Sequence, residues 1–199
     1  MWDIKYNENI EAKEITPKKK VRKRIEIVAY HEAGHTVYAA MLGMDFTRVT
    51  IIPDKEQGSE GSIDVLPEYG DTDFYYDTDY PELSWHAIKC DMAGIVSQAF
   101  VTGKFCWDGA GTDSKNSLHH VVEDVNEIPF QLLWDETIAF FEDDNTWKKV
   151  EIIARNLLKK KTLTFDEVFK FLDLERPIRD KEIFEKMKSE QELGVDGLP

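Results

Sequence analysis

The chain is poor in cysteine and contains no long apolar run. Its two cysteines, Cys90 and Cys106, do not form a Cys-x-x-Cys pair, so a cysteine-based zinc site is disfavoured and both are expected to be reduced core residues. No segment approaches the roughly 18 apolar residues of a membrane helix, and residues 1–5 lack the basic-then-apolar pattern of a signal peptide. We therefore expect a cytoplasmic protein without a membrane segment.

Basic residues are also scarce. The chain has 25 Lys and Arg against 39 Asp and Glu, which gives a formal net charge of -14. This imbalance disfavours nucleic acid as a partner, because phosphate binding depends on Lys and Arg, and it creates a field that attracts cations, including metals. The only basic cluster spans residues 18–24. It resembles a nuclear localisation string or an anion-binding patch, but the helical apolar pattern that follows favours the solvated start of a helix.

Apolar periodicity predicts one mainly α-helical domain with a small β element. Apolar residues at helical spacing from Ile25 predict a helix that Gly43 ends, and two short β-branched or alternating runs predict strands. The expected helices cover residues 21–42, 81–102, 113–125, 129–141 and 146–160, a short helix opens at Thr164 with an acidic residue three positions on, and the expected strands cover 48–53 and 62–67. We expect residues 1–20 to form a mobile arm, 21–175 the domain and 176–199 a charged tail.

The stretch His31-Glu32-Ala33-Gly34-His35 carries the strongest chemical signal. On a helix, residues i and i+4 share a face, so His31 and His35 can hold one Zn²⁺ and Glu32 can act on a water there as general base. The alternative is an ordinary helix with hydrogen-bonded histidines. The metal site is favoured because the pair lies on the inward-facing apolar stripe, where unpartnered histidines would be costly. Gly34 indicates either the close approach of another element or ordinary helix packing.

A catalytic zinc needs a third protein ligand and an open position for water. Asp113 is the leading candidate because it begins a predicted helix after the turn at residues 109–112, although it is one of 39 acidic residues. His119 and His120 are rivals, and their alternative role is that of surface or hydrogen-bonded histidines. The acidic loop 71–79 has oxygen ligands for Ca²⁺ but lacks the central glycine and final glutamate of an EF-hand, which favours a mobile flap.

Three motifs in register resemble the peptidase domain of FtsH-type proteases, peptidase family M41. They are Ala29–His35, Val49–Pro53 and Gly109–Asp113, and the similarity runs from about Lys23 to Leu172. The resemblance implies a mainly helical metallopeptidase domain with a small sheet, in which His31, His35 and Asp113 bind zinc and Glu32 is the catalytic base. It also implies a homo-oligomer, since such domains commonly assemble as hexamers.

The chain departs from that family in two respects. Family members usually carry an AAA+ ATPase module before the peptidase domain, whereas this chain has no Gly-x-x-x-x-Gly-Lys-Ser/Thr loop, and its start at Met1 favours a free-standing relative over a fragment. Substrate unfolding would then need an ATPase partner in trans. The family also places two adjacent glutamates where this chain has Gln98 and Ala99. Glutamine brings no negative charge to a ligating histidine, so zinc affinity or ligand basicity would be reduced.

These observations predict a zinc-dependent endopeptidase that acts on unfolded or flexible protein substrates. Glu32 would take a proton from a water at the zinc and pass it to the leaving amine. An extended peptide could add to the strand at residues 62–66, which is otherwise a plain hairpin member. Two alternatives are an inactive or regulatory protein-binding module on the same fold, and another His-Glu-x-x-His peptidase class whose third ligand lies on the helix holding Asp91. The presence of all four site residues favours the enzyme.

Overall fold

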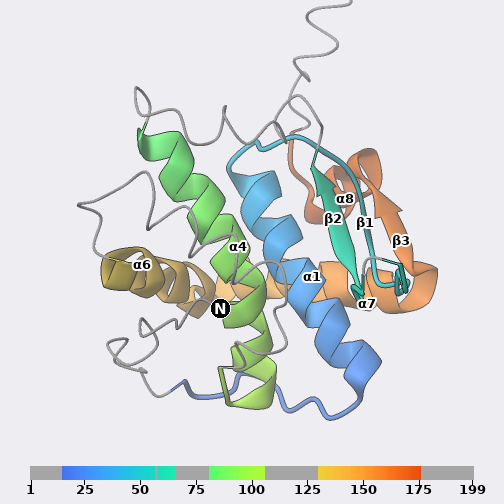
Figure 1. Cartoon of the computed structure of the whole chain (residues 1–199), viewed down its shortest axis with the longest axis horizontal. Coiled ribbons are helices and arrows are strands. Elements are labelled where there is room, and N and C mark those ends of the chain that lie inside the picture. The colour runs from blue at the N-terminus through green and yellow to red at the C-terminus, as the bar shows by residue number, and fades with distance from the viewer. Residues whose placement is uncertain (1–14, 57, 66–80, 106–129, 176–199) are drawn as a thin grey trace, which may run out of the picture.

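The computed structural model describes residues 15–56, 58–65, 81–105 and 130–175 (Figure 1). This part of the chain is mainly helical and carries one small antiparallel sheet, as the sequence predicts. The elements are α1 (Arg24–Met41), β1 (Phe46–Thr50), β2 (Ser62–Val65), α4 (Pro81–Thr102), α6 (Phe130–Glu142), α7 (Asp144–Lys160), β3 (Thr162–Thr164) and α8 (Phe165–Leu172). None of the described helices is both long enough and apolar enough to cross a membrane.

Helix α1 runs through the middle of the molecule. It packs most extensively against α4 and α7, and the strands lie beside it on the side away from α4 (Figure 1). Every residue from Val28 to Ala40 is buried, so α1 is covered nearly all round and not on a single stripe. A helix in this position can hold polar side chains only if the surrounding elements supply their partners.

The hydrophobic core gathers around α1 from both sides. Large, fully buried side chains come from α4, α6, α7 and the strands; they include Met92, Ile95, Trp134, Phe141, Ile153, Leu157, Phe46 and Leu163. Rings from different elements meet within this core. Tyr30 of α1 stacks on Trp147 of α7 with ring centroids 5.8 Å apart, and Tyr38 meets Phe140 of α6 at 5.0 Å. These contacts hold α1 at a fixed depth and rotation.

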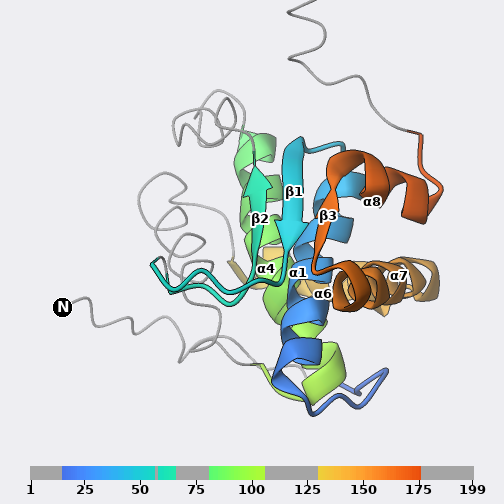
Figure 2. The same ribbon diagram turned by 90° about the vertical axis from the view of Figure 1, so that its right-hand side faces the viewer.

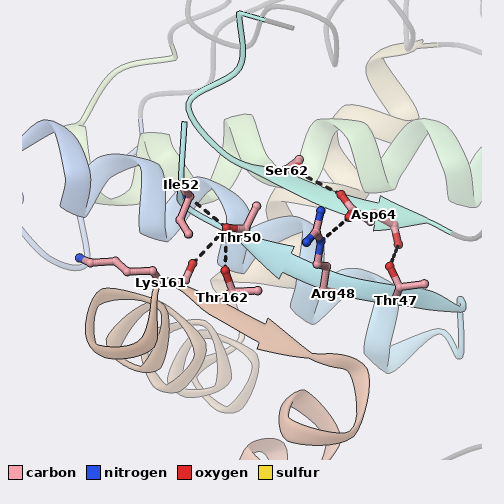
Figure 3. Close-up of polar contacts among 8 residues, drawn as sticks. All are labelled: Thr47, Arg48, Thr50, Ile52, Ser62, Asp64, Lys161 and Thr162. Carbon is pink, nitrogen blue, oxygen red and sulfur yellow. Dashed lines mark hydrogen bonds and ion pairs between the residues drawn. The ribbon is translucent and has the colours of Figure 1, made fainter. Parts of the chain in front are cut away.

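The sheet has the strand order β2-β1-β3, and both pairings are antiparallel (Figure 2). Central Val49 pairs with Ile63 on one side and Leu163 on the other, and Val49 and Leu163 are fully buried. Polar side chains on one face of the sheet tie central β1 to both of its neighbours. Arg48 donates to Asp64 at 2.6 Å, and the Thr50 hydroxyl lies 2.9 Å from that of Thr162 (Figure 3). Strand β2 is an outer strand of the described sheet, and Gly61 just before it lies against Glu32 of α1.

Helix ends follow the local signals closely. Helix α4 spans Pro81–Thr102, the predicted range, and Gly103 just beyond it has φ +76°, a conformation that favours glycine. Helix α8 begins with a complete capping box, in which the Thr164 side chain accepts from the Glu167 backbone and the Glu167 side chain accepts from the Thr164 backbone. The three-residue strand β3 just before it was not expected, because only Leu163 of its residues is buried.

The described residues before α1 lie against α4. Helix α1 begins at Arg24 and not at Val21, because the Val21 N–H donates to the Val101 carbonyl at 3.1 Å and so belongs to a different contact. Lys18 likewise donates its backbone N–H to the Phe100 carbonyl at 2.9 Å. Residues 1–14 of the expected arm lie outside the described residues, as do the expected helix at 113–125, the acidic loop 71–79 and the charged tail 176–199.

Candidate metal centre

Helix α1 brings the three predicted motif residues of its central turns into the interior. His31, Glu32 and His35 are 8, 5 and 4% exposed, respectively. The helix keeps its regular backbone here, and the Thr36 hydroxyl adds a hydrogen bond to the Glu32 carbonyl at 2.7 Å. Ionisable and polar side chains buried to this degree need specific partners. The arrangement around them therefore decides what they can do.

The two imidazoles converge on one point. The Nε2 atoms of His31 and His35 lie 3.1 Å apart, and the ring planes meet at 77° with centroids 4.8 Å apart. Two nitrogens bound to one tetrahedral Zn²⁺ at ~2.1 Å would be separated by roughly 3.4 Å. The observed separation is within a few tenths of an ångström of that value, and it also suits a single N–H···N hydrogen bond. The spacing therefore allows either a shared metal or a shared proton.

The hydrogen bond on the other side of His35 fixes its tautomer. Its Nδ1 lies 2.7 Å from the Cys90 carbonyl of α4. A carbonyl oxygen can only accept, so Nδ1 carries the hydrogen, and in the neutral ring Nε2 presents a lone pair toward His31. Metal-ligating histidines typically have this arrangement, because a carbonyl or carboxylate on the outer nitrogen orients the ring and raises its basicity.

Helix α4 closes over the two histidines at a glycine. A Cβ added at Gly94 would collide with His35 Nε2 and would lie 2.8 Å from His31 Nε2. The place that a side chain would take at Gly94 is therefore already occupied by the two imidazoles. No other residue type could stand at Gly94 without displacing them, so the convergence of the two rings depends on this one position.

Gly34 lies on the opposite side of the same crossing. A Cβ at Gly34 would collide with the Ala93 carbonyl oxygen and would lie 2.6 Å from Ser97 Cβ, and the Ser97 hydroxyl donates to the Tyr30 carbonyl at 2.7 Å. Another element does approach Gly34 closely, and it is the backbone of α4, so the two alternatives for this glycine coincide in a close helix–helix packing. Glycine on each helix thus lets α1 and α4 come close enough for the Cys90 carbonyl to reach His35.

Glu32 points toward the sheet. A Cβ added at Gly61, the residue just before β2, would lie 2.7 Å from Glu32 Oε1 and 2.9 Å from its Cδ. The carboxylate is therefore held between α1 and the start of β2. Glu32, the predicted general base, therefore lies on the side of the histidine pair that faces the start of β2, an outer strand of the described sheet.

The predicted third ligand, Asp113, lies outside the described residues, and so do its rivals His119 and His120. Asp91 is described, but within residues 15–56, 58–65, 81–105 and 130–175 no His, Cys, Asp or Glu side chain completes a three-ligand group with the pair. Two of the three expected metal ligands are thus brought together.

Two polar side chains of α4, Gln98 and His86, lie on either side of Gly94 along the helix. Gln98, one turn on, is 7% exposed, and Ala99 beside it is fully buried. In the other direction, the Tyr38 hydroxyl lies 3.4 Å from His86 Nδ1. Burial of Tyr38, and secondarily the nearby Cys90 and Glu136, raise the pKa of its phenol above the ordinary value, so Tyr38 keeps its proton at neutral pH.

Sequence reasoning did not single out Gly94, Gly61 or the Cys90 carbonyl. Gly94 offered a usable signal, since a glycine inside a 22-residue helix costs about 1 kcal/mol against alanine. Gly61 sat in a Gly/Ser turn, where glycine is ordinary. A backbone carbonyl carries no sequence signal at all. These three groups are identified only by the packing of α4 and β2 against α1.

No protein-family description matches the chain, and no curated protein sequence matches it significantly.

Proposed function

We propose that the chain is a zinc-dependent endopeptidase with an M41-like domain, which hydrolyses peptide bonds in unfolded or flexible protein substrates. The observation that carries the proposal is the buried pair His31 and His35, whose Nε2 atoms lie 3.1 Å apart. The hydrogen bond from His35 Nδ1 to the Cys90 carbonyl leaves the lone pair of the neutral ring on Nε2, where it can bind a metal. Gly94 of α4 lies against both nitrogens, and only glycine leaves the two rings room to converge there. The donor set and the separation of the two Nε2 atoms fit a Zn²⁺ ion.

His31 and His35 would hold the zinc, and Asp113 is the proposed third ligand by resemblance. When bound, zinc lowers the pKa of a coordinated water toward ~7 and polarises the scissile carbonyl. The proposed role of the Cys90 carbonyl is to keep His35 in the tautomer that can ligate. Gln98 on the same helix is uncharged, so the ligating histidines would be less basic than they would be beside a glutamate at that position.

Glu32 is the proposed general base. Its carboxylate oxygen would accept the proton of the attacking water and would later donate it to the leaving amine nitrogen. Its burial favours this role, because a carboxylate with few competing waters interacts strongly with the proton it receives. An extended substrate would pair with the outer edge of β2, whose first residue follows Gly61, and this pairing would carry the scissile bond past Glu32.

The proposed setting is the cytoplasm, where thiols stay reduced, and the buried Cys90 thiol donates to the His35 carbonyl at 3.8 Å. This sequence has no Gly-x-x-x-x-Gly-Lys-Ser/Thr loop, so we propose that substrates are flexible chains or are delivered by an ATPase partner in trans. A hexameric assembly follows from the family resemblance and is part of the same proposal.

The decisive experiment measures bound zinc per chain together with casein cleavage, for wild type and Glu32→Gln. We expect about one zinc per chain in both proteins and cleavage by wild type alone, because glutamine keeps the shape of Glu32 but cannot take a proton. His35→Ala is the matched control and should lose zinc and cleavage together. Absence of zinc from wild type would refute the proposal.

Gln98 favours a second candidate, a protein-binding module that keeps the site without turnover. Zinc in wild type without cleavage of casein, even with a partner ATPase present, would favour this module. The variant Gln98→Glu then separates the two functions. Restored cleavage would mean a weakened enzyme, whereas unchanged casein binding without cleavage would mean a binding module.

A further inference from the structure

The segment entering β2 is fixed on both sides of Gly61. Ser59 and Asp54 exchange two backbone hydrogen bonds, of 2.9 and 3.0 Å. The Glu60 carboxylate pairs with Arg24 of α1 at 2.5 Å, and Ser62 pairs with Thr50 of β1. The Arg24–Glu60 pair is about half exposed and is individually weak. Together these contacts leave Gly61 little freedom to move away from α1.

Glycine is not needed at position 61 for its backbone conformation. Gly43, Gly58 and Gly103 have positive φ, where other residues are strained, and Gly61 is not among these described glycines. An added Cβ at Gly61 would instead meet the Glu32 side chain at Oε1, Cγ and Cδ, all within 2.9 Å. What requires glycine here is therefore the space that the Glu32 carboxylate occupies.

The contacts of Gly61 and Gly94 are separate. A side chain at Gly94 would meet His31 and His35, whereas one at Gly61 would meet Glu32 only among its nearest neighbours. One glycine thus borders the nitrogens that would hold a metal, and the other borders the carboxylate that would move the proton. A methyl group at each position would perturb one half of the site and leave the other half in place.

We propose that Gly61 is a positioning residue for Glu32, and that the fixed turn before β2 holds the carboxylate in its working place. This inference rests on the proposed peptidase function and adds to it a residue outside the His-Glu-x-x-His motif. Glu32 has several rotatable bonds, and a base misplaced by about 1 Å can lose ~10²-fold in rate. Contact with a rigid, side-chain-free turn restricts those rotations where a flexible neighbour would not.

The test compares Gly61→Ala with Gly58→Ala, which adds the same methyl group to the same loop where nothing lies within 4 Å, and which also strains the backbone because Gly58 has φ +71°. For Gly61→Ala we expect unchanged zinc, a KM for casein within about twofold of wild type, and kcat lowered at least ~10-fold, because only the base is displaced. Gly58→Ala should keep kcat. Equal losses in both variants, or a wild-type kcat for Gly61→Ala, would overturn the inference.

A double-mutant cycle tests the contact without any activity. Gly61→Ala should lower Tm by about 2–6 °C in the wild-type background, because the added methyl group overpacks against Glu32. The same substitution should be nearly silent in the Glu32→Ala background, where that side chain is gone. An equal Tm loss in both backgrounds would refute the Glu32 contact. Wild type that binds zinc and cuts nothing would instead refute the peptidase proposal, and the two failures are thereby distinguished.

Discussion

At the residue scale, Gly94 determines whether the two histidine rings can converge. Its position on α4 faces both Nε2 atoms, and the Cys90 carbonyl one turn earlier holds His35 from the other nitrogen. The same helix therefore orients one ring and leaves both rings room to approach each other. A methyl group at Gly94 is the smallest change that would push the rings apart.

Gly94→Ala should lower zinc affinity at least ~10-fold while the protein stays folded. Alanine gains about 1 kcal/mol of helix propensity, which offsets much of the 1–3 kcal/mol that overpacking typically costs. The displaced imidazoles, in contrast, have no compensation. Zinc titration followed by competition with a chelator measures the affinity, and thermal unfolding of the apo protein measures the fold.

Gly43→Ala is the control for Gly94→Ala, because its Cβ would meet open space at the end of α1. It has a positive φ, so alanine there costs about 1 kcal/mol in backbone strain and should not change zinc affinity. Zinc affinity of wild-type strength in Gly94→Ala would mean that the convergence of the two histidines at Gly94 is not what holds the metal.

At the element scale, α8 is held at its first turn by a charged hydrogen bond. Glu167 accepts from Lys160 Nζ at 2.5 Å and from the Thr164 N–H at 3.0 Å, and these two bonds, the Lys160 bond first, lower the pKa of Glu167 below its ordinary 4.5. Because the pKa of Glu167 is lower in the folded state, its ionised form stabilises the protein above about pH 4.5. This contribution is lost as the pH falls through the folded-state pKa.

Glu167→Gln should therefore lower the free energy of unfolding by about 0.3–1 kcal/mol at pH 7 and by less at pH 3. Glutamine can still complete the capping box, so the substitution isolates the charge. Thr164→Ala, which removes the cap itself, should cost about 1 kcal/mol at both pH values. Urea unfolding at the two pH values measures both, and a pH-independent loss for Glu167→Gln would contradict the assigned role of the ion pair.

Elements whose ends are marked by capping or helix-breaking residues were predictable from the sequence, and elements fixed by distant contacts were not. Pro81 and Gly103 bracket α4, and the Thr164–Glu167 pattern marks the start of α8, because caps and stops act within one turn. Strand β3 lacks such a signal, since its short run becomes a strand only by pairing with β1. The site divides in the same way. The i, i+4 spacing predicted the histidine pair, whereas the glycines that border it required the packing of α4 and β2.

At the scale of the whole molecule, the segment before α1 joins elements that are far apart in the chain. The Lys18 ammonium donates to the Glu142 carbonyl of α6 at 2.6 Å and lies 3.1 Å from Asp144 Oδ1 of α7. It also lies 5.8 Å from the Phe100 ring centre of α4 and 5.9 Å from that of Trp147. Lys18 thus holds the α6–α7 junction to the end of the helix that carries Gly94. The basic run is in part a structural clamp, which the sequence pattern alone did not indicate.

Lys18→Met and Lys20→Met form a matched pair within that run. Lys18 has a side chain only 20% exposed, whereas Lys20 is exposed. Methionine keeps the apolar stem of either lysine but removes the ammonium. Because a hydrogen bond from a charged donor typically contributes 1.5–3 kcal/mol and part of it is exchanged for water here, we expect Lys18→Met to lower stability by about 1–2 kcal/mol, or ~2–8 °C in Tm. Lys20→Met should stay within ~0.5 kcal/mol of wild type. Equal and small losses would mean that the segment lies on the domain without holding it, and the junction of α6 and α7 would then be stabilised by the buried core alone.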